Sequence, residues 1–95
     1  MSAIIVASYR VTNPEGFQDY PPAAQATLAA HGDEVIAVDL ESEGLEGDTY
    51  PCTVVLKFES KEAAKAWYNS PEYKEAAPLR HDNSEGTMVL INGTD

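Results

Sequence analysis

The feature that most constrains this chain is a pair of predicted strands that are apolar on both faces. Side chains alternate between the two faces of a strand, so a sheet with one solvated face shows alternating apolar and polar residues. Residues 3–11 instead hold two apolar sets, with Ile5, Ala7, Tyr9 and Val11 in one and Ile4 and Val6 in the other. Residues 87–91 likewise place Met88 and Leu90 in one set and Val89 and Ile91 in the other. Both faces of the sheet must therefore be covered.

Cap residues and prolines predict the first helical region. Asn13-Pro14-Glu15 is typical of a helix start, with Asn at the N-cap and Pro at the first helical position. Pro21 and Pro22 interrupt this helix, because an interior proline removes a hydrogen bond and clashes with the preceding turn. We therefore expect a kink near Tyr20 and a second segment over residues 22–30, stopped by Gly32.

The second half of the chain predicts two central strands, a helical region and a last strand. The central strands span 34–40 and 52–58 and are joined by an acidic, glycine-containing connection. In the first of them, strict alternation places Ile36, Val38 and Leu40 opposite Val35 and Ala37. Ser60 caps a helix that restarts at Ser70-Pro71-Glu72 and ends at Pro78 or Leu79.

The element order is β-α-β-β-α-β, which predicts an α+β, ferredoxin-like sandwich. Right-handed crossovers then put both helices on one face of a four-stranded antiparallel sheet. A chain of 95 residues has one core, so we expect a single domain over 1–95 with no third layer. An identical subunit is the simplest cover for the second apolar face, so the sequence predicts a homodimer.

Charge and cysteine content exclude several classes of function. With 16 Asp and Glu against 6 Lys and Arg, the net charge of −10 disfavours nucleic acid and anionic membranes as partners. A single cysteine, Cys52, forms no intramolecular disulfide, and the N-terminus lacks a signal-peptide pattern, so a cytoplasmic location is expected. His31 and His81 lie far apart without nearby ligands at metal-binding spacing, so no metal or other cofactor is expected.

Five residues are candidates for a small-molecule site. His31 ends the first helical region, where an imidazole can act as an acid, a base or simply a helix cap. Arg80 can bind a carboxylate through paired hydrogen bonds or form a structural ion pair. Tyr20, Trp67 and Tyr73 offer aromatic walls with polar tips, although most aromatic residues of a small domain belong to its core. Of Trp67 and its neighbour Tyr68, Trp67 is expected to point inward.

Several segments resemble a known family. They are Asn13-Pro14-Glu15, Thr27 to Gly32, Leu45-Glu46-Gly47, Val54 to Ser60, Ala63 to Tyr73 and Leu79-Arg80. Together they are similar to the domain-of-unknown-function family 1330 of the dimeric α/β-barrel superfamily. The resemblance covers nearly the whole chain, and its most specific part is the Trp-Tyr-x-Ser-Pro-Glu-Tyr stretch that begins at Trp67.

The resemblance implies a ferredoxin-like subunit that pairs sheet to sheet with a twofold mate, leaving a cavity between sheet and helices. The superfamily includes cofactor-free monooxygenases, lactone isomerases and haem-degrading enzymes, while this family has no established reaction. The chain departs from the family pattern in two places: Asp33 stands where the family usually has a glycine, and Val38-Asp39-Leu40-Glu41 replaces a segment that usually carries Arg-Gly-Gly.

Three hypotheses follow for the function. The first is a dimer whose subunits bind a small, partly apolar molecule with an oxygen or carboxylate group. The second is a cofactor-free oxygenase or isomerase in which His31 moves a proton and Arg80 or Tyr73 stabilises developing charge. The third is a structural or regulatory dimer without a ligand.

Overall fold

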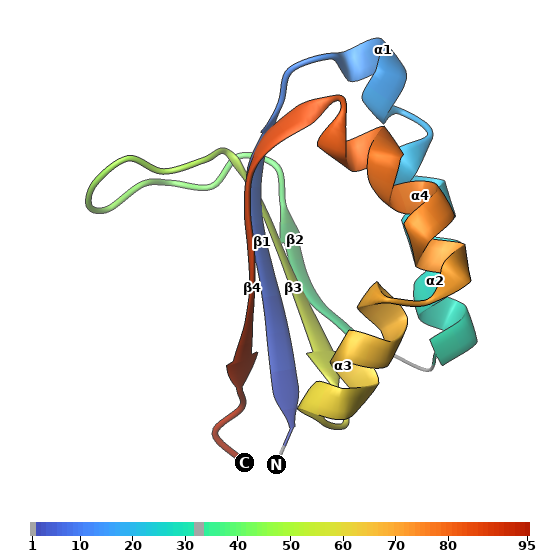
Figure 1. Ribbon diagram of the computed structural model, residues 1–95. Helices are drawn as coiled ribbons and strands as arrows, with labels where there is room; N and C mark the ends of the chain where they lie inside the picture. The colour runs from blue at the N-terminus through green and yellow to red at the C-terminus, as the bar shows by residue number, and fades with distance from the viewer. Residues whose placement is uncertain (1, 32–33) are drawn as a thin grey trace.

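A four-stranded antiparallel sheet with all helices on one face forms the molecule (Figure 1). The computed structural model describes residues 2–31 and 34–95. The strands are β1 (Ala3–Val11), β2 (Glu34–Asp39), β3 (Cys52–Phe58) and β4 (Ser84–Asn92), in the order β2-β3-β1-β4. The helices are α1 (Pro14–Phe17), α2 (Tyr20–His31), α3 (Lys61–Tyr68) and α4 (Pro71–His81). The ferredoxin-like α+β prediction is confirmed.

The first helical region is broken rather than kinked. Helix α1 ends at Phe17 and α2 begins at Tyr20, so the predicted kink is a complete interruption before Tyr20. The reason is that Pro21 and Pro22 lie in the first turn of α2, where the backbone N–H that proline lacks would have no partner within the helix. The predicted stop at Gly32, like the departure at Asp33, lies outside the described residues.

Serine caps start both later helices as predicted. The Ser60 hydroxyl accepts a hydrogen bond from the Ala63 backbone N–H, and that of Ser70 accepts one from Tyr73. Asn13 behaves differently, because its side-chain amide donates to Asn83 Oδ1 instead of capping α1. Helix α4 also runs past the predicted end at Pro78 or Leu79 and finishes at His81.

Strand β2 contains an irregularity that changes which side chains face the helices. Its register on β3 shifts between Val35, opposite Leu56, and Ala37, opposite Val55. Such a bulge adds one residue and reverses the alternation beyond it. Val35 and Val38 consequently share one face, whereas strict alternation had placed them on opposite faces.

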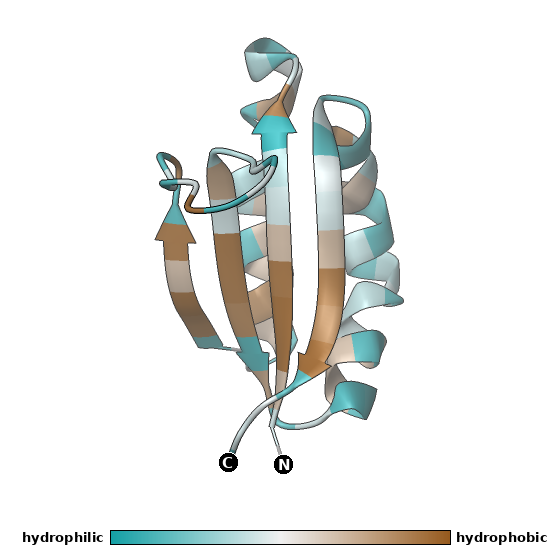
Figure 2. Cartoon of the chain, turned by 90° about the vertical axis from the view of Figure 1, so that its left-hand side faces the viewer, coloured by the Kyte–Doolittle hydropathy of each residue, from teal (hydrophilic) through white to brown (hydrophobic). Residues whose placement is uncertain are grey.

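The two faces of the sheet differ in what covers them. Helix-facing side chains such as Ile5, Leu56 and Phe58 are buried against Trp67 and Tyr73. The other face has no helix on it, and its strands are apolar over much of their length (Figure 2). Five of its apolar side chains lie in neighbouring register positions of the three strands β3, β1 and β4: Ile4, Val6, Val55, Val89 and Ile91. We call these five residues the outer apolar patch.

Helix packing leaves a space over one half of the sheet. Helix α2 packs mainly on α4, whereas α3 rests on β1, β4 and β3. Since α2 contacts the sheet much less than it contacts α4, a hollow remains between α2 and strands β1, β2 and β3.

Candidate functional site

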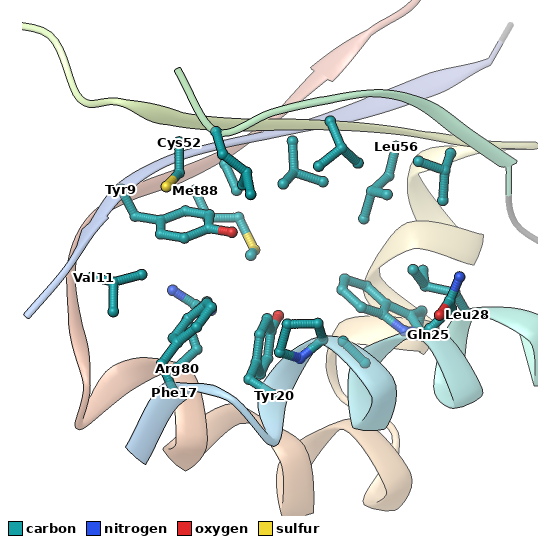
Figure 3. A pocket seen from close by; sticks show the side chains of 18 of the residues that line it. Tyr9, Val11, Phe17, Tyr20, Gln25, Leu28, Cys52, Leu56, Arg80 and Met88 are labelled. Carbon is teal, nitrogen blue, oxygen red and sulfur yellow. The ribbon is translucent and has the colours of Figure 1, made fainter. Parts of the chain in front are cut away.

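This hollow is a cavity of about 590 Å³, within the range of small-molecule sites (Figure 3). Its floor is the inner face of the sheet and its roof is α2 together with the end of α4. The lining side chains are mostly apolar, and they include Ala7, Val11, Phe17, Ala24, Leu28, Val35, Val38, Val54, Leu56 and Met88. No acidic residue is among the described residues that line it.

The cation of the cavity lies at one end with two other polar side chains. Figure 3 shows Tyr9, Cys52 and Arg80 near one another, whereas Leu28, Leu56 and the amide of Gln25 lie at the far end. Tyr20 lies between these two groups, on the first turn of α2. The cavity is therefore polarised: one end carries a cation, and the other end is apolar apart from Gln25.

A chain of hydrogen bonds links three of the predicted residues. The hydroxyls of Tyr20 and Tyr73 lie 2.9 Å apart, and Arg80 Nε donates to Tyr73 Oη at 3.4 Å. Burial raises the pKa of Tyr20, and the neighbouring Tyr73 raises it further, so Tyr20 stays protonated. Burial acts to lower the pKa of Arg80, but both hydroxyls raise it, and the net shift is upward. A fixed positive charge therefore stands beside the Tyr73 hydroxyl and the protonated phenol of Tyr20.

Trp67 forms a wall of the cavity and is held by a buried hydrogen bond. It is only 1% exposed, which confirms that it points inward, whereas Tyr68 is 40% exposed. Its indole Nε1–H donates to Thr27 Oγ1 at 3.0 Å. The ring packs on Tyr73 with centroids 4.2 Å apart. The indole N–H is thus used inside the core, and the cavity meets the ring itself.

The structure brings four of the five predicted residues together. Tyr20, Trp67 and Arg80 line the cavity, and Tyr73 lies behind them and contacts it through Tyr20 and Arg80. His31 is the exception, because it is exposed and does not line the cavity. The cavity-facing stripe of α2 ends one turn earlier, at Leu28.

Sequence reasoning did not select Tyr9. The alternation of β1 could have identified it, because Tyr9 shares a face with Ile5 and Ala7 and therefore places a phenol among the apolar side chains that face the helices. Cys52, directly opposite Tyr9 on β3, is buried as expected, and burial raises the pKa of its thiol. Arg10, the other arginine, forms an ion pair with Glu85 at 3.2 Å and is not part of the cavity.

Two further features bear on function. Within residues 2–31 and 34–95, no three side chains of His, Cys, Asp or Glu come together as a potential metal site. No helix in the described part of the chain has the length and apolar character to cross a membrane.

Comparison with known proteins agrees with the fold. The model of a domain of unknown function, DUF1330, matches residues 2–94. No protein with a curated description is similar enough in sequence to match. The fold is similar to that of RPA0582, a protein of unknown function from Rhodopseudomonas palustris, with 14% identity, a TM-score of 0.72, and 93% of this chain and 80% of that one covered.

Two similar structures carry functional names. SnoaB, a cofactor-independent oxygenase from Streptomyces nogalater, has 14% identity and a TM-score of 0.67, with 99% of this chain and 94% of that one covered. An antibiotic biosynthesis monooxygenase has 18% identity and a TM-score of 0.57, with both chains fully covered at 100%. At these identities the likeness shows a shared fold.

Proposed function

Because this chain belongs to the DUF1330 family, a domain of unknown function, we propose its role from its own cavity: it binds a small, partly apolar molecule that carries an oxygen group. The single observation behind this proposal is the polarised cavity of about 590 Å³ between α2 and the sheet. Apolar surface removed from water contributes roughly 25 cal/mol per Å², so this lining favours a hydrocarbon body. The hydroxyl of Tyr20 and the guanidinium of Arg80 offer donors to an oxygen acceptor.

Calorimetric titration with 2-naphthol, a neutral aromatic alcohol, tests this proposal. The wild-type protein should bind it, and Ala24→Leu, which adds bulk where a buried alanine lines the cavity, should weaken binding at least tenfold, a loss of about 1.4 kcal/mol. Ala29→Leu is the matched control, since Ala29 is exposed on the same helix. Equal affinities for all three proteins, or no binding to any of them, would contradict the proposal and leave the ligand-free role.

We further propose that the protein is a homodimer that pairs through the outer apolar patch. Val89 is 49% exposed and Ile91 46% exposed, and each lies directly opposite a β1 member of the patch, Val6 and Ile4. Twofold packing would bring two identical patches together and remove them from water. Val89→Glu should halve the mass measured by sedimentation, whereas Leu45→Glu, on the exposed connection between β2 and β3, should not. A mass unaffected by Val89→Glu would refute this interface.

A second candidate function is cofactor-free oxygenation or isomerisation. The fold shared with SnoaB supports it, together with the chain of Tyr20, Tyr73 and Arg80 inside an apolar cavity. Since His31 lies away from the cavity, Arg80 is the group that would stabilise an anion formed in a reaction. Turnover of an enolisable aromatic substrate that survives His31→Ala and is lost in Arg80→Gln would support this candidate. Loss of turnover in His31→Ala would contradict this assignment.

A further inference from the structure

We propose that Tyr9 and Arg80 form an anion subsite, and that the ligand is an apolar monocarboxylate. This inference rests on the proposed binding function and names the class of ligand. The carboxylate would lie between the Tyr9 phenol and the Arg80 guanidinium, with its hydrocarbon body extending towards Leu28 and Leu56.

The first observation is a buried phenol with an unused donor. Tyr9 is 7% exposed, and its hydroxyl has no hydrogen-bond partner among the described residues. Figure 3 shows that its ring reaches from β1 towards the middle of the cavity. Because this hydroxyl faces the cavity, its donor is free for a group that enters the cavity and replaces solvent there. A ligand acceptor would supply the missing partner.

The second observation is a guanidinium without a counterion. Among the described residues the ion pairs are those of Arg10 with Glu85 and of Lys57 with Asp95, so Arg80 has no carboxylate within 4.0 Å. This is notable in a chain with 16 acidic residues. Arg80 Nε donates to Tyr73, and one Nη lies 2.8 Å from His81 Nε2, which leaves further N–H donors of its five for a ligand.

The two groups act on the same region of the cavity. Burial raises the pKa of Tyr9, which keeps its phenol a donor, while the charge of Arg80 acts in the opposite direction. A carboxylate has two oxygens, so it can accept from the phenol and from the guanidinium at once. The described residues of the lining include no second cation, which favours a monoanion over a phosphate with two charges.

The expected ligand therefore has one charged end and a hydrocarbon body. Arg80 and Tyr9 lie at the polar end, and the cavity continues past Tyr20 to the apolar side chains of α2 and β3 (Figure 3). A cationic ligand is disfavoured by Arg80, and a neutral ligand would leave its charge uncompensated.

A matched pair of probes tests the inference by calorimetry at pH 7.5: 4-phenylbutanoate and its neutral isostere 4-phenylbutanamide. The wild-type protein should bind the carboxylate at least about tenfold more tightly than the amide, as a charge-assisted hydrogen bond implies. Arg80→Gln should abolish this preference, and Tyr9→Phe should weaken carboxylate binding several-fold. Arg10→Gln and Tyr68→Phe are controls, because neither residue lines the cavity.

The outcomes separate this inference from the proposed binding function. If the wild-type protein binds both probes equally and also binds 2-naphthol, the cavity binds ligands but the anion subsite is refuted. If it binds none of the three, both proposals fail. The wild-type comparison needs no variant, so a folding defect in Arg80→Gln, which circular dichroism would reveal, does not decide the result.

Discussion

Removal of the Thr27 hydroxyl should destabilise the protein by leaving the Trp67 indole N–H without a partner. Thr27 is 7% exposed and Trp67 1% exposed, and the hydrogen bond between them is 3.0 Å long. Thr27→Val preserves shape and has a similar helix propensity, so the losses are this bond and the one that the Thr27 hydroxyl donates to the Ala24 carbonyl. Leaving a buried donor unsatisfied costs about 1–3 kcal/mol.

Urea unfolding followed by Trp67 fluorescence measures this loss. For a small domain with a slope near 1–1.5 kcal/mol per molar urea, we expect the midpoint of Thr27→Val to fall by roughly 1–2 M. The exposed Thr94→Val is the matched control and should leave the midpoint unchanged. All proteins are compared at one concentration, because dimerisation would make the midpoint depend on it. Equal midpoints for Thr27→Val and wild type would refute the reasoning.

Three further predictions concern Gly86, Tyr20 and Cys52. Gly86→Ala should lower the free energy of unfolding by about 1–3 kcal/mol, because Gly86 has φ +156° and a Cβ there would clash with the Ser8 carbonyl oxygen. An unchanged thermal midpoint would contradict this. Burial raises the pKa of Tyr20, so as the pH rises above about 10 its phenolate forms only in the unfolded chain. The free energy of unfolding should therefore decline above that pH, and it should decline less steeply in Tyr20→Phe. Urea midpoints of the two proteins that change in parallel between pH 9 and about 11 would argue against this. Burial also raises the pKa of the Cys52 thiol, so a disulfide reagent at pH 8 should modify this thiol far more slowly in the native protein than in urea. Similar modification rates in the native protein and in urea would contradict a buried thiol.

Local signals predicted most of the fold. Side-chain parity in residues 3–11 set the two faces of β1, and Ser60 and Ser70 marked two helix starts, because caps and alternation depend on nearby residues only. The bulge in β2 could not be predicted in this way. It depends on pairing with β3, and it moves Val35 and Val38 onto the cavity face.

The candidate site was predictable only in part. Helical spacing predicted that Tyr20 and Trp67 point inward, but the contact of Tyr20 with Tyr73, 53 residues further along the chain, depends on how α2 packs on α4. The position of His31 outside the cavity could not be predicted, because it depends on how α2 is placed over the sheet and on where the cavity ends along the helix. Tyr9 was missed because a tyrosine in a strand is usually an ordinary core residue; only the missing hydroxyl partner sets it apart.

Native mass spectrometry of freshly purified protein tests the central claim most directly: one face of this sheet encloses a ligand cavity while the other binds a second subunit. We predict a species at twice the chain mass of 10.3 kDa, with bound small molecules that dissociate on activation and are depleted in Ala24→Leu. A species at the single-chain mass at micromolar concentration, with nothing bound, would contradict the account.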